Sequence, residues 1–208
     1  YSIGKFEQAI DNEMSQRLGG NAREVELFLN ELKASALQKR DRYVKDASLI
    51  YHTSMREGAP FKSQLTQWLK NDSASGLTLF ARDGRMLVSV FKDDNSQVRS
   101  FLPTQDAVFL SATYMSQAQE NGELSIAEFR EKNKINLILI SRIKGANGRV
   151  VGYLEQVIDL NRAMVNKLNK RLKLELIFIK DDGKVIVASH NDLYKFSDIA
   201  VTQLQLFA

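Results

Sequence analysis

Few side chains in this sequence have the type and spacing needed for catalysis or metal binding. There is no cysteine, which excludes disulfides, thiolate zinc sites and cysteine nucleophiles. His52 and His190 are the two histidines, and neither has a second histidine or a carboxylate at metal-ligand spacing. The acidic pairs Asp93-Asp94 and Asp181-Asp182 fall in expected turns, where carboxylates often bond to the backbone. With no nucleophile elbow, phosphate-binding glycine loop or zinc-protease motif, the sequence predicts neither an enzyme nor a bound metal or cofactor.

One basic residue stands out because it interrupts an apolar run. Arg142 lies within Ile135–Ile143, which is otherwise typical of a buried strand. On an exposed strand face it would pair with Glu155 across a hairpin. Aimed into a pocket, its guanidinium would favour a carboxylate or phosphate ligand through a bidentate contact. Both interpretations stay open at this level.

Composition and charge argue against a nucleic-acid partner. The 208 residues carry 29 Lys and Arg against 25 Asp and Glu, a net charge of +4, and the two signs are interleaved along the chain. Nucleic-acid binders concentrate basic residues in a stripe or tail, whereas interleaved charges indicate a solvated surface or a weak attraction to anionic membranes. Gly145-Ala146-Asn147-Gly148 matches a nucleic-acid-clamping loop, but it lies between two strand patterns and is better explained as a hairpin turn. No run approaches the about 20 apolar residues of a membrane span.

The N-terminal part has the periodicity of one very long helix. Apolar residues recur mostly every three or four positions from Ile3 to Ile50, which predicts a helix from Ser2 to Glu57 that stops before Pro60. Gly19-Gly20 weakens its middle by about 1 kcal/mol per glycine, so a kink or break there is an alternative. Such a helix would exceed about 75 Å, longer than a small domain is wide. We therefore expect a parallel homodimer through this helix, at least between Ile3 and Leu37.

The next hundred residues predict a short helix and an antiparallel sheet. Alternating apolar patterns and an Asp-Gly turn signal predict four strands that share one sheet. They are Leu77–Ala81, Met86–Phe91, Ile135–Ile143 and Val150–Ile158. A helix at Phe61–Leu69 precedes them, and a polar loop at Asp93–Gln97 and a helix at Gln105–Gln119 lie between the two hairpins.

The pattern then begins again at a fixed distance. A helix over 159–171 is followed by strand patterns at 174–179 and 185–188, and Gly183 of the second Asp-Gly turn lies 99 residues after Gly84 of the first. Helix, strand, turn and strand all repeat at that offset, which indicates two tandem α+β modules with the second one short. The expected domains are a long helix at 1–58, a first module at 59–158 and a partial second module at 159–208.

These segments resemble the extracytoplasmic Cache, or PAS-like, sensor domains of bacterial receptors, in their double-Cache form. The hairpin Leu77–Val88 looks like the opening strand pair of that family, and Ile140–Leu154 looks like its closing pair. Ile158-Asp159-Leu160 leads into a helix and a second hairpin, as in double-Cache receptors. The sequence departs from the family's amino-acid receptors, because Trp68 lies ahead of the first strand without their aromatic-Arg-Trp-Tyr-Asp pattern.

The resemblance implies an α+β fold with a long N-terminal helix, PAS-like antiparallel modules and a sensory function. A small molecule, anionic if Arg142 faces it, would bind over the first module's sheet under the segment 93–133. Candidate contacts are Arg99, Tyr114, Arg130, Arg142 and Tyr153, although a tyrosine at the position of Tyr153 is more often a half-buried strand aromatic than a ligand contact. The domain would face the periplasm as part of a histidine kinase, chemoreceptor or diguanylate cyclase that is anchored in the inner membrane.

An alternative is a protein-interaction module of the same fold that docks a periplasmic binding protein or a partner receptor. The two functions differ in whether the space over the sheet is an open pocket or is filled by the chain's own leucine, phenylalanine and methionine side chains.

Overall fold

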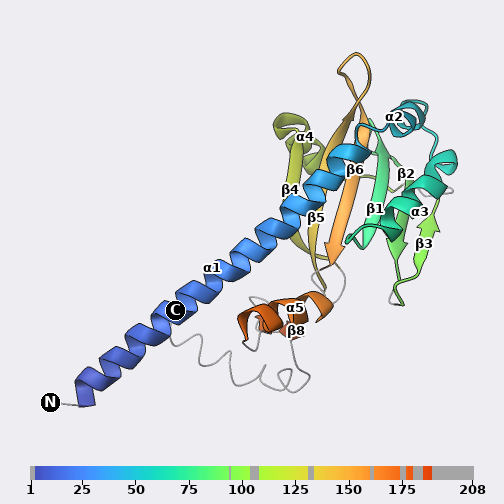
Figure 1. Ribbon diagram of the computed structural model, residues 1–208. Coiled ribbons are helices and arrows are strands. Elements are labelled where there is room, and N and C mark those ends of the chain that lie inside the picture. The colour runs from blue at the N-terminus through green and yellow to red at the C-terminus, as the bar shows by residue number, and fades with distance from the viewer. Residues whose placement is uncertain are drawn as a thin grey trace. The chain divides into compact units, whose positions relative to one another are not determined.

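The computed structural model describes residues 3–93, 95–103, 108–130, 134–159, 162–173, 177–179 and 185–188 (Figure 1). The chain forms two compact units, one comprising Tyr1–Ala34 with Asn161–Ala208 and the other Ser35–Leu160. The second unit contains the whole of the first sheet. Because this unit begins at Ser35, it also includes the C-terminal part of the expected helix domain at 1–58.

The predicted long helix is two helices. Helix α1 spans Ile3–Tyr43 and continues through Gly19-Gly20, and α2 spans Ala47–Ser54. The prediction of one helix to Glu57 was wrong because Asp46 starts a new helix: its backbone is extended and its side chain accepts a hydrogen bond from the Leu49 amide at 2.9 Å.

One six-stranded antiparallel sheet dominates the second unit, in the order β3-β2-β1-β6-β5-β4. Its strands are β1 (Gly76–Ala81), β2 (Met86–Lys92), β3 (Val98–Phe101), β4 (Glu123–Arg130), β5 (Lys134–Lys144) and β6 (Val150–Asp159). The four predicted strands therefore share one antiparallel sheet, as expected. Edge strands β3 and β4 were not predicted.

Helix α4 (Ala112–Asn121) begins later than the predicted helix at Gln105–Gln119. The reason is that Val108 and Phe109 are extended and bond to the first hairpin. The Met86 amide donates to the Val108 carbonyl at 2.8 Å, and Phe109 forms a β-bridge with Arg85.

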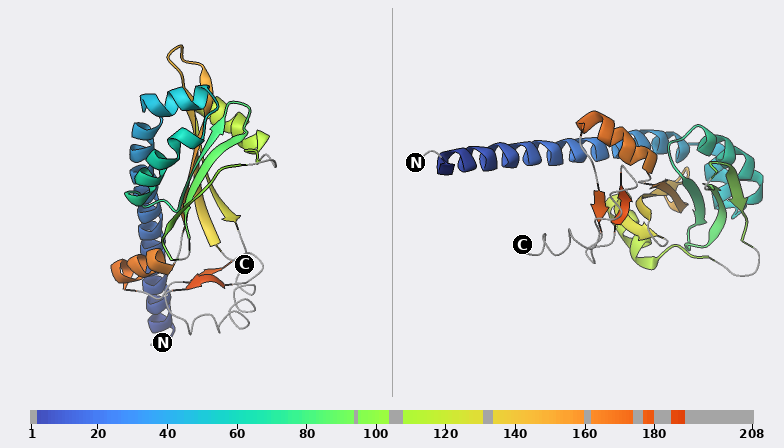
Figure 2. Two further views of the ribbon diagram at one scale, coloured as in Figure 1. Left: turned by 90° about the vertical axis from the view of Figure 1, so that its right-hand side faces the viewer. Right: turned by 90° about the horizontal axis from the view of Figure 1, so that it is seen from below.

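Cross-strand register divides the sheet into two differently covered faces (Figure 2). One face packs against α2, the short 3-10 helix η1 (Ala59–Phe61) and α3 (Lys62–Lys70). Its fully buried side chains include Leu77, Leu79, Val88, Val90, Leu154 and Ile158. The other face carries α4 at one end. The core of the unit therefore lies mainly between the sheet and the α2–α3 layer.

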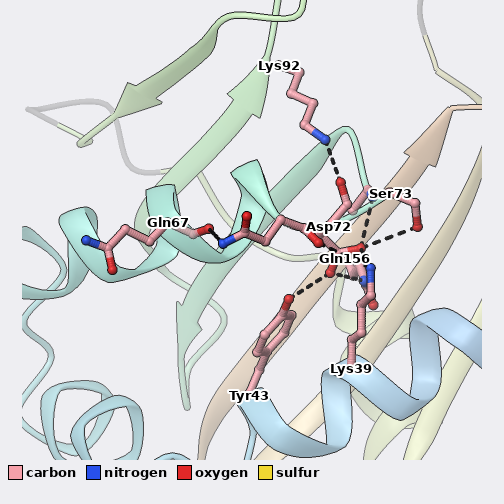
Figure 3. A network of polar contacts seen from close by, with 9 residues as sticks. Lys39, Tyr43, Gln67, Asp72, Ser73, Lys92 and Gln156 are labelled. Carbon is pink, nitrogen blue, oxygen red and sulfur yellow. Dashed lines mark hydrogen bonds and ion pairs between the residues drawn. The ribbon is translucent and has the colours of Figure 1, made fainter.

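A buried carboxylate, that of Asp72 in the α3–β1 loop, connects the end of α1 to the sheet (Figure 3). Its Oδ2 accepts hydrogen bonds from the Tyr43 hydroxyl at 2.8 Å and from Gln156 Nε2 at 3.1 Å. Its Oδ1 accepts one from the Ala74 amide at 3.1 Å and lies 3.4 Å from Lys39 Nζ. Since Tyr43 and Lys39 belong to α1 and Gln156 to β6, this one side chain fixes the helix against the centre of the sheet.

A second, partly buried ion pair holds α1 through Arg40, which lies next to Lys39 on the helix. Arg40 donates to Glu123 of β4 and, at 3.0 Å, to the Ser141 hydroxyl of β5. Its pKa is raised by its bonds to Glu123 and Asp41, although burial, the largest contribution, opposes the shift. The end of α1 therefore contacts the middle and the far edge of the sheet through charged groups.

The other unit contains a second hairpin that repeats the first in detail. Strands β7 (Ile177–Ile179) and β8 (Val185–Ala188) pair antiparallel after α5 (Arg162–Leu172). The pairing shifts between Phe178 and Ile179, and in the first hairpin it shifts between Leu79 and Phe80. These two irregularities lie 99 residues apart, the offset found in the sequence, so the repeat extends to a local break in strand register. The predicted turn at 181–184 lies outside the described residues.

The Tyr43 hydroxyl allows a test of the Asp72 cluster by pH. Burial, followed by the hydrogen bond to Asp72, raises the pKa of Tyr43. The folded state then keeps this proton at a pH where the unfolded tyrosine loses it, so the stabilisation is complete below about pH 10 and falls as pH rises further. We expect urea unfolding of Tyr43→Phe to show a smaller loss of stability between about pH 9 and 11 than wild type. Tyr51→Phe, at an exposed tyrosine, is the matched control, and an unchanged slope for Tyr43→Phe would contradict the assignment.

Candidate functional site

The part of the sheet under α4 is filled by the chain's own side chains. Tyr153 is 3% exposed and lies in an apolar cluster with Phe80, Met86 and Ile140. Tyr114 of α4 packs half-buried against the same cluster. Burial raises the pKa of Tyr153, against the opposing effect of nearby arginines. The structure thus places Tyr153 as a strand aromatic in the core.

Arg142 is held by the end of α4. Its Nη1 donates to the carbonyl of Gln119 at 2.9 Å, and it lies against Gly122, whose φ of +85° ends the helix. Its cross-strand partner is Tyr153, while Glu155 pairs with Ile140. The expected pairing of Arg142 with Glu155 was therefore wrong by two residues along β6, and the guanidinium donates to a helix carbonyl instead.

The remaining two candidates lie at edges of the sheet. Arg99 of β3 is exposed and donates from Nε to Asp93 at 3.0 Å, a bond that is the main cause of the lowered pKa of Asp93. Arg130 is the last residue of β4 and pairs with Lys134 in the backbone register. Its side chain lies outside the described part of the chain. The structure thus brings together Tyr114, Arg142 and Tyr153 beside α4, and it places Arg99 on the edge strand β3, with β2 and β1 between it and the strand of Tyr153.

An open pocket of about 290 Å³ lies further along the same face of the sheet. We call it the sheet-face pocket, lined by Ser75, Gly76, Thr78, Ser89, Phe91, Lys92, Asn136, Glu155, Val157 and Asp159. Register explains the grouping, because Thr78 pairs with Ser89 on one side and with Glu155 on the other, and Gly76 pairs with Phe91 and Val157. At Gly76 an added Cβ would meet its nearest heavy atom at 3.6 Å. The absent side chain therefore leaves space in the floor of the pocket.

The lining of the sheet-face pocket is polar and carries both signs of charge. Thr78, Asn136 and Glu155 are buried. The Thr78 and Ser89 hydroxyls share a hydrogen bond at 2.9 Å, and Ser75 donates to Asp159 at 2.7 Å.

Carboxylates of Glu155 and Asp159 can bind a cationic or amino group, and the Lys92 ammonium can bind a carboxylate. Phe91, which is 43% exposed, and Val157 supply apolar surface. Buried, hydrogen-bonded polar groups on rigid strands beside apolar surface are typical of a site for a small polar molecule. Within the described residues there is no group of three or more His, Asp or Glu side chains placed to hold a metal ion.

Sequence reasoning missed this lining although it contained a signal. Thr78, Ser89, Asn136 and Glu155 each interrupt an apolar strand, as Arg142 does. Strand alternation places all of them on one face once the register is known. The missing information was the pairing of β1 with β6, which joins strands that are far apart in the sequence.

Comparisons with known proteins give structural matches only. No family model matches the sequence, and no curated protein matches it either. The sensory domain of the Campylobacter jejuni chemoreceptor Tlp3 superposes with a TM-score of 0.60 at 13% identity, covering 92% of this chain and 76% of that one. A domain from Vibrio parahaemolyticus, assigned to a sensory box/GGDEF family protein, gives 0.60 at 17% identity over 86% and 72%. The periplasmic domain of Vibrio cholerae LuxQ gives 0.51 at 14% identity over 79% and 75%. The chain therefore has the Cache-like fold of the extracytoplasmic sensory domains of bacterial receptors.

Proposed function

We propose that this chain is the extracytoplasmic sensory domain of a bacterial membrane receptor and binds a small molecule in the sheet-face pocket. The observation that carries the proposal is an open, partly buried polar cavity on the sheet of a sensory-domain fold. Its volume of about 290 Å³ suits a compact metabolite, at the lower end of ligand pockets in general. The alternative function, docking of a binding protein, depended on a filled space. That condition holds beside α4 but not beside Gly76.

The charges of the pocket define the class of ligand. Glu155 and Asp159 outnumber Lys92, so the ligand carries an amino group or another cation, with room for a carboxylate near Lys92. This replaces the anionic ligand expected from Arg142, whose guanidinium is bonded to Gln119. Amino acids are the first class to test, because ligand-binding domains of Tlp3 have been solved with L-valine and with isoleucine bound.

Lys92 supplies a physical connection from the pocket to α1. It lines the pocket, and its Nζ donates to the Asp72 carbonyl oxygen at 2.6 Å. Burial, the largest effect, lowers the pKa of Lys92, so this ammonium is costly to leave without a partner. A ligand that draws Lys92 away would weaken a bond to the residue that also holds Tyr43 and Lys39. Binding would thereby alter the attachment of α1 to the sheet.

The proposal also covers the place of this domain in a full-length membrane receptor. A domain of this fold would face the periplasm, tethered to the inner membrane, and would act on a cytoplasmic kinase, cyclase or chemotaxis output without catalysing a reaction itself. Within the described part of the chain, no helix is long and apolar enough to cross a membrane. We also propose that two copies pair in parallel through α1.

A ligand screen with matched variants tests the pocket. We expect a thermal-shift screen of amino acids, amines, organic acids and purines to find a ligand that carries an amino or other cationic group. Asp159→Asn should weaken its binding by about 1.5–3 kcal/mol, as expected for a lost charged hydrogen bond. Gly76→Ala should fold, because the added methyl meets only ordinary contacts, and should weaken binding by filling the floor. Asp83→Asn in the exposed β1–β2 turn is the control, and equal affinity for all four proteins would exclude the pocket.

Cross-linking in a membrane-bound receptor tests the dimer. Ile10 and Met14 belong to the apolar sequence stripe of α1, and Asn12 lies about half a turn round the helix from both. We expect Ile10→Cys and Met14→Cys to form disulfide-linked dimers under mild oxidation and Asn12→Cys to do so much less. Cross-linking at all three positions to the same extent, or at none, would contradict a parallel pairing through the stripe.

A further inference from the structure

Four arginines gather at the end of the sheet opposite to the sheet-face pocket. Arg56 follows α2, Arg82 and Arg85 lie in the β1–β2 hairpin, and Arg149 precedes β6. Arg56, Arg82 and Arg149 line a cavity of about 310 Å³. A second cavity of about 220 Å³ is lined by Arg56 and Arg85. We call this group of residues the arginine cleft; Arg56 belongs to both of its cavities.

The segments that form the cleft are held together by close backbone packing. A side chain at Gly58 would clash with the carbonyl of Leu87, and one at Gly152 would clash with Thr53 and with the backbone of Phe80. These two glycines let α2 and the turn after it lie directly against β2 and β6. Arg56 therefore follows a helix that packs directly on the strands, and Arg82, Arg85 and Arg149 lie in the turns next to these strands.

Arg56 has an unusual backbone for its residue type. Its φ is +60°, in the left-handed region that favours glycine at helix C-termini and costs other residues about 1 kcal/mol or more. Such conformations persist only where the surrounding structure holds them, and they are enriched at active sites and ligand-binding sites. The position keeps a cationic side chain at the point shared by the two cavities.

Negative charge in the cleft is scarce. Asp83 pairs with Arg56 at 3.2 Å. Among the described residues, no carboxylate forms an ion pair with Arg82, Arg85 or Arg149, whereas Arg40, Arg99 and Arg171 all have carboxylate partners. Asn147 and Ser54 add further polar groups to the wall of the larger cavity. Guanidinium groups converging from several segments on one cavity are suited to bidentate binding of phosphoryl or carboxylate oxygens.

We propose that the arginine cleft is a second binding site, for a small anion that carries two or more negative charges, such as a phosphoryl or polycarboxylate group. Arg82 and Arg149 hold the anion in the larger cavity, and Arg56 and Arg85 raise the local positive potential. This site is independent of the sheet-face pocket, which lies at the other end of the strands and favours the opposite charge.

Calorimetric titration at constant ionic strength tests the site with inorganic phosphate, pyrophosphate and citrate as probes. We expect pyrophosphate and citrate to give saturable binding heats with wild-type protein, above the heats of control titrations with chloride at the same ionic strength. Inorganic phosphate should bind more weakly than pyrophosphate and citrate. Arg82→Gln with Arg149→Gln should reduce the association constant at least about tenfold, because two charged hydrogen bonds are lost.

Arg99→Gln is the matched control, since it removes an exposed arginine of the same unit that has its own partner in Asp93. It should leave anion binding unchanged. All substituted arginines are exposed, so the variants should keep the wild-type circular dichroism spectrum and melting temperature within a few degrees. Absence of binding by wild type, or equal losses in Arg99→Gln and in the double variant, would overturn the proposal. Neither outcome bears on the ligand of the sheet-face pocket.

Discussion

The arrangement of the sheet-bearing unit depends on the carboxylate of Asp72. A buried charge is unfavourable unless hydrogen bonds and opposite charges replace its water, and here donors from α1, β6 and the neighbouring loop do so. Those donors lie far apart in the sequence, so the bonds can form together only when helix, loop and sheet are in place. The Oε1 atom of Gln156, beside this carboxylate, is buried and has no hydrogen-bond partner among the residues that the structure describes. This unsatisfied oxygen lies beside Asp72, through which Lys92 of the pocket is proposed to act on α1.

The same sheet face has two different ends because its residues change character along the strands. Near the β1–β2 and β5–β6 turns, Phe80, Ile140 and Tyr153 make an apolar surface that α4 covers. Toward the other end, the polar residues Thr78, Ser89 and Glu155 lie near Gly76, and space remains above this glycine. Small or polar side chains gain little from burial under a helix, so the part of the sheet that carries them can stay open as a cavity. The β1–β6 pairing brings several such residues together.

Local patterns predicted the central architecture well, because strand alternation and Asp-Gly turns act over short distances. The four strands, their single sheet and the 99-residue repeat all follow from such signals. The break between α1 and α2 did not follow, because apolar spacing continues across it and neither glycine nor proline marks it. Edge strands β3 and β4 were missed because polar residues such as Arg99, Ser100, Glu123 and Glu128 dilute their alternation. The contact of Arg142 with the Gln119 carbonyl did not follow from the sequence either, because it depends on how α4 packs on the sheet.

The central claim, that the sheet-face pocket binds a ligand and that binding alters the attachment of α1, is tested most directly by amide NMR. The titrant would be the amino acid or amine that gives the largest thermal shift. We predict saturable chemical-shift changes at Gly76, Ser89 and Asp159, and changes at Asp72, Tyr43 and Lys39 that follow the same saturation curve. Saturable shifts confined to the residues under α4 or to the β5–β6 turn would contradict it. Shifts in the pocket without any at Asp72 or in α1 would contradict the coupling.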